Sequence, residues 1–182
     1  MVSPASTRTK IVVDPVALLK REHRMILDRL LMVETAMSSR SVRGGAVQRT
    51  NRETLRELLE FFTGPVDVHF TREAMLVGSL RRILGREQEA PEQFQGFLDE
   101  HRALKADAAA VMSLLAGKRA GGLDATASTS FRGWRTLTGQ LDAMIRRYRE
   151  QIASEERLLF ALAEMRLTAG QRRRISRRML QV

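Results

Sequence analysis

Apolar residues recur at helical spacing along almost the whole chain, and no segment keeps the apolar–polar alternation that is typical of a strand. The first run is preceded by Asp14, which favours an N-cap, and by Pro15, which is well tolerated in the first helical turn. Its apolar face comprises Val16, Leu19, Ile26, Leu27, Leu30 and Val33. The pattern predicts a helix that begins near residue 14 and buries one face.

Three further helices are predicted. The second begins near residue 50 and is kinked or broken at Gly64-Pro65, because proline lacks the backbone donor of a helix interior. The third begins near Pro91, and the fourth spans about residues 127–165. The inward face of the fourth helix is predicted to comprise Phe131, Trp134, Leu137, Leu141, Ile145, Ile152, Leu158 and Leu162.

Four long helices joined by short links predict an all-α fold, an up-down-up-down four-helix bundle with a short basic C-terminal helix. We expect a flexible tail over residues 1–13, the bundle over 14–167 and the basic helix or tail over 168–182, with Thr168 as its N-cap. Residues 171–182 carry few apolar side chains, so we expect this segment to be dispensable for folding.

Composition excludes several classes of protein. A chain of 182 residues suffices for one domain with a core. The absence of Cys excludes disulfides, thiolate metal sites and Cys nucleophiles. No apolar run approaches the ~20 residues that span a bilayer, and no secretory signal is recognisable, so we expect a cytoplasmic protein.

The net charge of +10 is unevenly distributed. Seven of the ten excess positive charges lie in residues 1–13 and 171–182, which contain no acidic residue. A basic segment of this kind is more often a solvated terminal helix, and contact with a polyanion through residues 171–182 is the alternative.

The three His residues are the strongest functional signal. His23, His69 and His101 fall on three different predicted helices, each among residues of the apolar face. Glu73 follows His69 by four residues and therefore shares its helical face. On the fourth helix, Glu155 follows Gln151 by the same spacing. Imidazole and carboxylate groups together suit iron, manganese or zinc. A bundle interior does not hold bare carboxylates without a cation or donors.

The chain resembles the hemerythrin-like HHE cation-binding domain family over roughly residues 14–165. The resemblance rests on four segments in order, which read LLKREHRMILDRL, HFTREAMLVGSL, FLDEHRALKADA and YREQIASEERLLFALAEMR. All three His residues lie at motif positions within the first three of these segments.

The resemblance implies a metal site with the ligands His23, His69, Glu73 and Glu155, and with His101 as a fifth. Family members that bind two irons have further imidazoles where this chain has Lys105 and Gln151. We therefore expect one ion per chain rather than two, most readily iron, with manganese or zinc as other candidates.

Lys105 has two interpretations. Its ammonium could replace the second metal and pair with Glu73 or Glu155, or it could turn aside toward solvent. Lys105, Gln151 and Tyr148 are expected around the ligands. The Tyr148 hydroxyl could form a hydrogen bond with a metal-bound oxygen species, or Tyr148 could be a core residue with its hydroxyl at the end of the bundle.

Three functions are compatible with these residues. The first, which the resemblance implies, is a non-haem iron protein that handles dioxygen, peroxide or nitric oxide. The second is a metal-free or zinc-filled bundle that acts as a binding module. The third is an enzyme that uses a one-metal site or Lys105 on a small organic substrate; the sequence leaves enzymatic activity, the catalytic residues and the oligomeric state open.

Overall fold

The computed structural model describes residues 13–38, 45–85, 90–116 and 131–182. Within these ranges the chain is almost entirely helical and contains no strand, which confirms the all-helical prediction. The helical elements in chain order are α1 Pro15–Ser38, α2 Gly45–Glu60, the 3₁₀ turn η2 Phe61–Thr63, α3 Pro65–Leu84, α4 Ala90–Leu115, α5 Phe131–Ser154, the π-helical segment η4 Glu155–Phe160, α6 Ala161–Arg166 and α7 Ala169–Met179.

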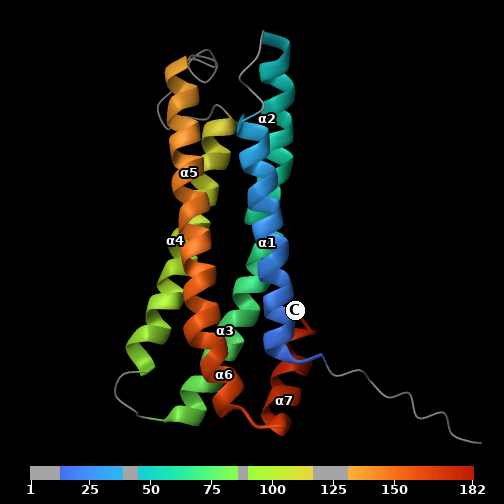
Figure 1. Ribbon diagram of the computed structural model, residues 1–182, viewed down its shortest axis with the longest axis vertical. Helices are drawn as coiled ribbons and strands as arrows, with labels where there is room; N and C mark the ends of the chain where they lie inside the picture. Colours follow the sequence, from blue (N-terminus) through green and yellow to red (C-terminus); the bar gives the residue numbers. More distant parts are fainter. Residues whose placement is uncertain (1–12, 39–44, 86–89, 117–130) are drawn as a thin grey trace, which may run out of the picture.

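The long helices lie side by side along the longest axis of the molecule (Figure 1). α2 continues through η2 into α3, and α5 continues through η4 into α6, so each pair occupies the place of one long helix. The short α7 packs against α1 and α3 at the end where α1 begins. No helix among the described ranges is long and apolar enough to cross a membrane.

Two predicted boundaries agree with the structure. Oδ1 of Asp14 accepts a hydrogen bond from the backbone N–H of Val16 at 2.9 Å, which caps α1. Pro65 is at the start of α3, directly after η2, so the predicted interruption lies where the proline removes a backbone donor.

The fourth predicted helix differs from expectation in its register. The π-helical segment η4 widens one turn, so the residues that follow are rotated relative to a regular α-helix. Leu158, predicted to face inward, is 43% exposed, whereas Leu159 and Phe160 are buried. Trp134 is only partly buried, and the side chain of Phe131 and residues 127–130 lie outside the described residues.

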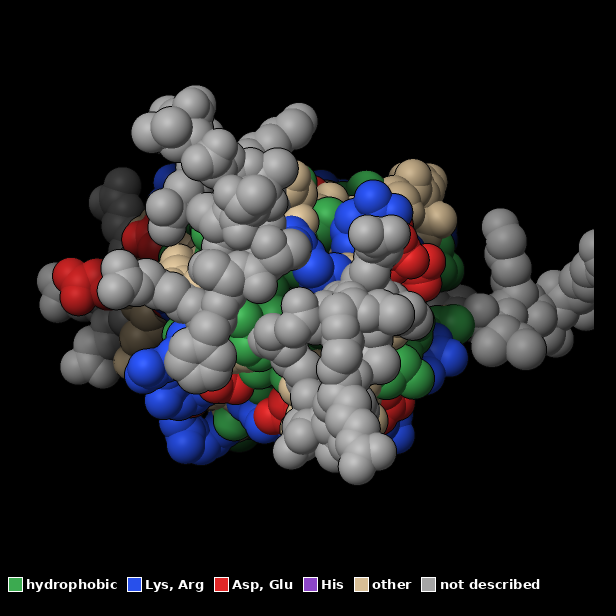
Figure 2. Space-filling view, turned by 90° about the horizontal axis from the view of Figure 1, so that it is seen from above, with side chains coloured by type: hydrophobic (Ala, Val, Ile, Leu, Met, Phe, Trp, Pro, Cys, Tyr) green, Lys and Arg blue, Asp and Glu red, His purple; other side chains and the backbone are tan. Residues whose placement is uncertain are grey.

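The buried apolar residues form two clusters. The larger cluster includes Ile26, Leu104 and Ile152, and the smaller one includes Leu19 and Phe160. Where undescribed residues do not cover this end of the molecule, hydrophobic side chains are visible near the middle, with Lys, Arg, Asp and Glu side chains beside them (Figure 2). His23, Glu73, His101 and Glu155 lie between the two clusters along their helices, and His69 lies within the α3 stretch of the larger one, next to Phe70.

The basic C-terminal helix belongs to the folded body. Thr168 caps α7 through a reciprocal pair of hydrogen bonds with Gln171. Ile175 and Met179 are buried in the smaller cluster. The basic character of the segment is therefore confined to its outer face, and its deletion is expected to cost more than the sequence indicated.

Candidate metal centre

Five buried side chains from four helical segments converge between the two apolar clusters. α1 contributes His23, α3 contributes His69 and Glu73, α4 contributes His101, and Glu155 is at the start of η4. They form two groups of potential ligands, His23–His69–Glu73 and Glu73–His101–Glu155, and the donor atoms within each group lie within 4.8 Å of one another. The structure therefore brings together all five residues that were predicted as ligands, and Glu73 belongs to both groups.

The two carboxylates connect His23 with His101. Nε2 of His23 lies 3.2 Å from Oε1 of Glu73 and 3.3 Å from Oε2 of Glu155. Nε2 of His101 lies 3.1 Å from Oε2 of Glu73 and 2.7 Å from Oε1 of Glu155. Each carboxylate thus presents one oxygen to each imidazole.

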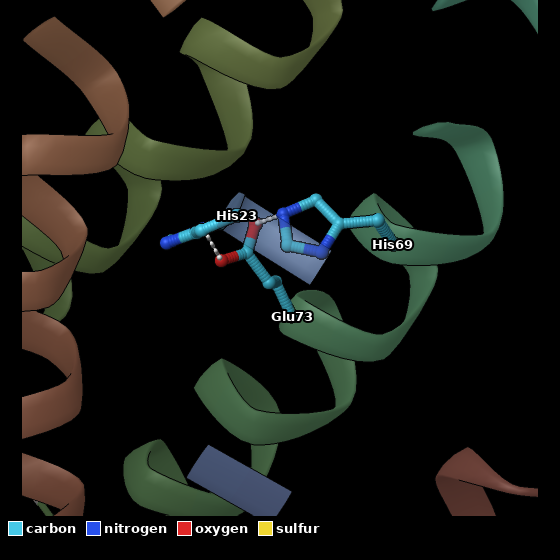
Figure 3. Close-up of side chains that lie close together, drawn as sticks. All are labelled: His23, His69 and Glu73. Carbon is cyan, nitrogen blue, oxygen red and sulfur yellow. Dashed lines mark hydrogen bonds and ion pairs between the residues drawn. The ribbon is translucent and has the colours of Figure 1, made fainter. Parts of the chain in front are cut away.

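His69 and Glu73 approach the centre together from α3. Because they are one helical turn apart, Nε2 of His69 lies 3.3 Å from Oε2 of Glu73. Figure 3 shows the Glu73 carboxylate between the rings of His69 and His23. The two His rings meet edge to face, with centroids 4.9 Å apart.

Charge inside the centre is balanced by imidazolium groups when no cation is bound. Burial lowers the pKa of His23, but hydrogen bonds and charge interactions with Glu155 and Glu73 outweigh it and raise that pKa to about 10. Burial also lowers the pKa of His101, but hydrogen bonds and charge interactions with Glu155 and Glu73 outweigh it and raise that pKa to about 9. Burial raises the pKa of Glu73, but the surrounding His residues outweigh this effect and lower it well below its usual range.

The outward nitrogens of two imidazoles are held by carboxylates that the sequence analysis did not identify. Nδ1 of His69 lies 3.0 Å from Oε2 of Glu22, and Nδ1 of His23 lies 3.0 Å from Oε1 of Glu156. An ionised carboxylate can only accept, so each Nδ1 donates its proton outward. Such carboxylates orient metal-binding His residues. No spacing in the sequence could pair them, because each pair joins different helical segments.

Aromatic rings close two sides of the centre. Phe160 stacks on His23 with ring centroids 5.0 Å apart, and Phe70 stacks on His101 at 4.2 Å. Phe160 is at the end of η4 and Glu155 is at its start. One widened turn therefore positions both a candidate ligand and an apolar wall, in keeping with the frequent occurrence of π-helical turns at functional sites.

Lys105 does not pair with Glu73 or Glu155. Its Nζ lies 2.9 Å from Oδ1 of Asp67, and its side chain is 43% exposed. The ring of Phe70 lies beneath the ammonium, 5.9 Å from it, while also stacking on His101. The inward interpretation is therefore wrong: the ammonium pairs with Asp67 at the surface and keeps the hydration that burial beside Glu73 and Glu155 would remove.

Gln151 and Tyr148 are both buried on α5. The Gln151 side-chain amide donates a hydrogen bond to Oε1 of Glu155, one turn further on, so Gln151 contacts a candidate ligand directly. The Tyr148 hydroxyl has no hydrogen-bond partner among the described residues, and its ring packs between Phe62 and Phe70. Burial raises the pKa of Tyr148, so its hydroxyl stays protonated.

A cavity of about 260 Å³ lies against the outer edge of His69. Its polar end is formed by His69, Glu22 and Arg72, and the remaining residues are mostly apolar. The residues that line it include neither Glu73 nor Glu155. The cavity therefore reaches the side of His69 that faces away from the carboxylates.

The donor set fits a metal cation. Oε2 of Glu73 is buried and has no hydrogen bond among the described residues, although it faces two imidazoles. Donor atoms that bind one ion at about 2.1 Å and at right angles lie about 3 Å apart. The imidazole nitrogens lie 2.7–3.3 Å from the oxygens of Glu73 and Glu155, which is close to this donor–donor spacing. The same distances are also those of ordinary hydrogen bonds.

Comparison with known families agrees with this geometry. The family model of the hemerythrin HHE cation-binding domain matches residues 14–163, which include all five converging side chains. The chain therefore belongs to the hemerythrin HHE cation-binding domain family. Comparisons with curated proteins and with solved structures gave no significant match.

Proposed function

We propose that this protein binds one non-haem metal ion, iron by preference, through His23, His69, Glu73, His101 and Glu155. We further propose that it handles dioxygen, peroxide or nitric oxide there. The observation that carries the proposal is the pair of buried ligand groups that share Glu73. Membership of a cation-binding family supports the metal, the donor types support iron, and dioxygen, peroxide or nitric oxide is what the resemblance to hemerythrin-like proteins implies.

The ligand types favour iron or manganese over zinc. Structural zinc sites are almost always four-coordinate, and their usual donors include thiolate. Here five donors of two kinds, three imidazoles and two carboxylates, are available without any Cys. Mixed imidazole and carboxylate ligation is typical of non-haem iron.

The residues of the chain have three roles around such an ion. A redox-active metal would supply the electrons or the coordination position that a small oxygen or nitrogen oxide ligand needs. Glu22 and Glu156 hold His69 and His23 so that their Nε2 atoms point inward. Phe70 and Phe160 limit the access of water. Gln151 holds the Glu155 carboxylate.

The cavity beside His69 does not favour an enzyme that acts on an organic substrate at the metal. A molecule in that cavity would contact the outer edge of His69 and the pair of Glu22 with Arg72. Neither Glu73 nor Glu155 is among the residues that such a molecule would contact there.

Elemental analysis of protein from iron-supplemented cells, read with its ultraviolet–visible spectrum, tests the proposal. We expect about one iron per chain, and loss of most of it in His69→Ala and in Glu73→Gln. Glu150→Gln is the matched control, because Glu150 is an exposed carboxylate on α5 that belongs to neither ligand group. Unchanged metal content in Glu73→Gln, or two irons per chain with the bands of an oxo-bridged pair, would contradict the proposed site.

A further inference from the structure

A second cavity, of about 310 Å³, lies between α3 and α7. Its lining residues are Ser79, Arg82, Ile83, Gln171, Arg174, Ile175 and Arg178. Three of these seven residues are Arg, and none is acidic. The cavity shares no lining residue with the candidate metal centre, so it requires a separate explanation.

Among the described residues, the three guanidinium groups have no carboxylate partner. Within the part of the chain that the structure describes, no acidic oxygen lies within 4.0 Å of Arg82, Arg174 or Arg178. Other arginines pair with acids, as Arg72 does with Glu22 and Arg172 with Asp14. The cavity therefore has positive charge that no acidic side chain of the described residues neutralises.

This arrangement has an electrostatic cost. Arg174 and Arg178 are one helical turn apart on α7, and like charges at that spacing destabilise a helix. Arg82 adds a third positive charge from α3, on the other side of the cavity. An anion that binds between the two helices would remove this repulsion.

The remaining residues give the cavity a specific character. The side-chain oxygen of Gln171 is engaged by the N–H and hydroxyl of Thr168, which leaves its amide NH₂ as a donor. Ile83 and Ile175 provide apolar surface beside the Arg groups. The volume is at the lower end of the roughly 300–1,000 Å³ of small-molecule sites.

We propose that this cavity binds a small phosphate ester, with its phosphate group held by Arg82, Arg174 and Arg178 and its organic part against Ile83 and Ile175. Guanidinium groups match the geometry of phosphate oxygens with paired hydrogen bonds. The proposal is independent of the metal: it rests on unpaired positive charge, on a shaped cavity and on an apolar side that a bare anion would leave uncovered.

Calorimetric titration of the full-length protein with phenyl phosphate, adenosine monophosphate and inorganic phosphate tests the proposal at physiological ionic strength. We expect at least one of the two esters to bind at sub-millimolar to millimolar concentration and more tightly than inorganic phosphate. Arg82→Gln and the double variant Arg174→Gln/Arg178→Gln should each weaken ester binding about tenfold or more. Both should keep the helical circular dichroism spectrum, because these side chains are exposed.

Arg173→Gln/Arg177→Gln is the matched control. It removes two exposed charges from the same helix at the same spacing, and neither residue lines this cavity. Equal weakening by both double variants would show general attraction to a basic helix and would overturn the proposal. Ester binding no tighter than that of inorganic phosphate, or no binding by any probe, would overturn it as well.

Duplex DNA is the competing source of phosphate. Tighter binding of DNA than of either ester, equally sensitive to both double variants, would overturn the proposal and assign α7 to a polyanion.

Discussion

Nε of Arg72 donates a hydrogen bond to the backbone carbonyl oxygen of Met179 at 3.0 Å. The same guanidinium pairs with Glu22, and Glu22 accepts the Nδ1 proton of His69. A chain of polar contacts therefore links the end of α7 to a candidate metal ligand. The C-terminal helix helps to set the orientation of His69 as well as covering the smaller apolar cluster.

Glu22→Gln should weaken metal retention about 10- to 100-fold without unfolding the protein. The amide carbonyl can still accept from His69, but the charge that makes the imidazole a stronger ligand is lost. Competition with a chromophoric chelator measures the change. Glu164→Gln removes a half-exposed carboxylate that pairs with Lys20, so it serves as the control. Equal metal affinity in Glu22→Gln and wild type would show that Glu22 has no part in the site.

Met179→Ala should lower the free energy of unfolding by about 2–5 kcal/mol, because a fully buried side chain is lost from the smaller cluster. Leu180→Ala is the control, since Leu180 is 55% exposed and should cost little. Urea denaturation of both variants measures the difference. Similar midpoints for the two variants would restore the expectation from sequence that α7 is dispensable.

The stability of the metal-free protein should fall as pH rises from about 6.5 to about 10. The pKa values of His23 and His101 are raised from 6.5 to about 10 and about 9. Their contribution to the free energy of unfolding is therefore complete below pH 6.5 and is lost progressively as the imidazolium groups deprotonate. The total should be of the order of a few kcal/mol. Urea midpoints across this pH range, with a chelator present, measure it.

Metal-loaded protein provides the contrast. A cation needs the imidazoles deprotonated, so binding should release about two protons, from His23 and His101, and should strengthen as pH rises. Calorimetry in buffers of different ionisation enthalpy counts these protons. If no protons are released near neutral pH, the two imidazoles are already neutral and the charge balance described above is incorrect.

Lys105→Met should leave metal content and spectrum unchanged and should alter stability by at most about 1 kcal/mol. The ammonium forms an exposed pair with Asp67, and such pairs contribute little. Asp67→Asn should give a change of similar size. A large loss of metal in Lys105→Met would instead support the interpretation that the ammonium lies in the interior beside Glu73 or Glu155.

Tyr148→Phe should leave the stability of the metal-free protein unchanged or raise it by about 1 kcal/mol. The hydroxyl is buried without a hydrogen-bond partner among the described residues, so its removal relieves a desolvation cost. Thermal unfolding in the presence of chelator checks this. A clear loss of stability would mean that the hydroxyl has a partner, such as a buried water.

Local chemistry was sufficient to predict the helices and the placing of His69 and Glu73 on one helical face. Asp14 and Pro15 predict the start of α1, and Pro65 predicts the interruption before α3, because capping and the missing proline donor act within one turn. His69 and Glu73 share a face by spacing alone. Family resemblance added His23, His101 and Glu155 to one site.

The tertiary structure decided what depends on contacts between helices. Neither the pairing of Glu22 with His69 nor the position of Arg82 opposite α7 has a sequence signal, since each joins residues on separate helices. The exposure of Leu158 follows from the π-helical turn, which regular helical spacing does not anticipate. Lys105 pairs with Asp67, a residue of another helix, so its outward position also depends on how α3 and α4 pack together.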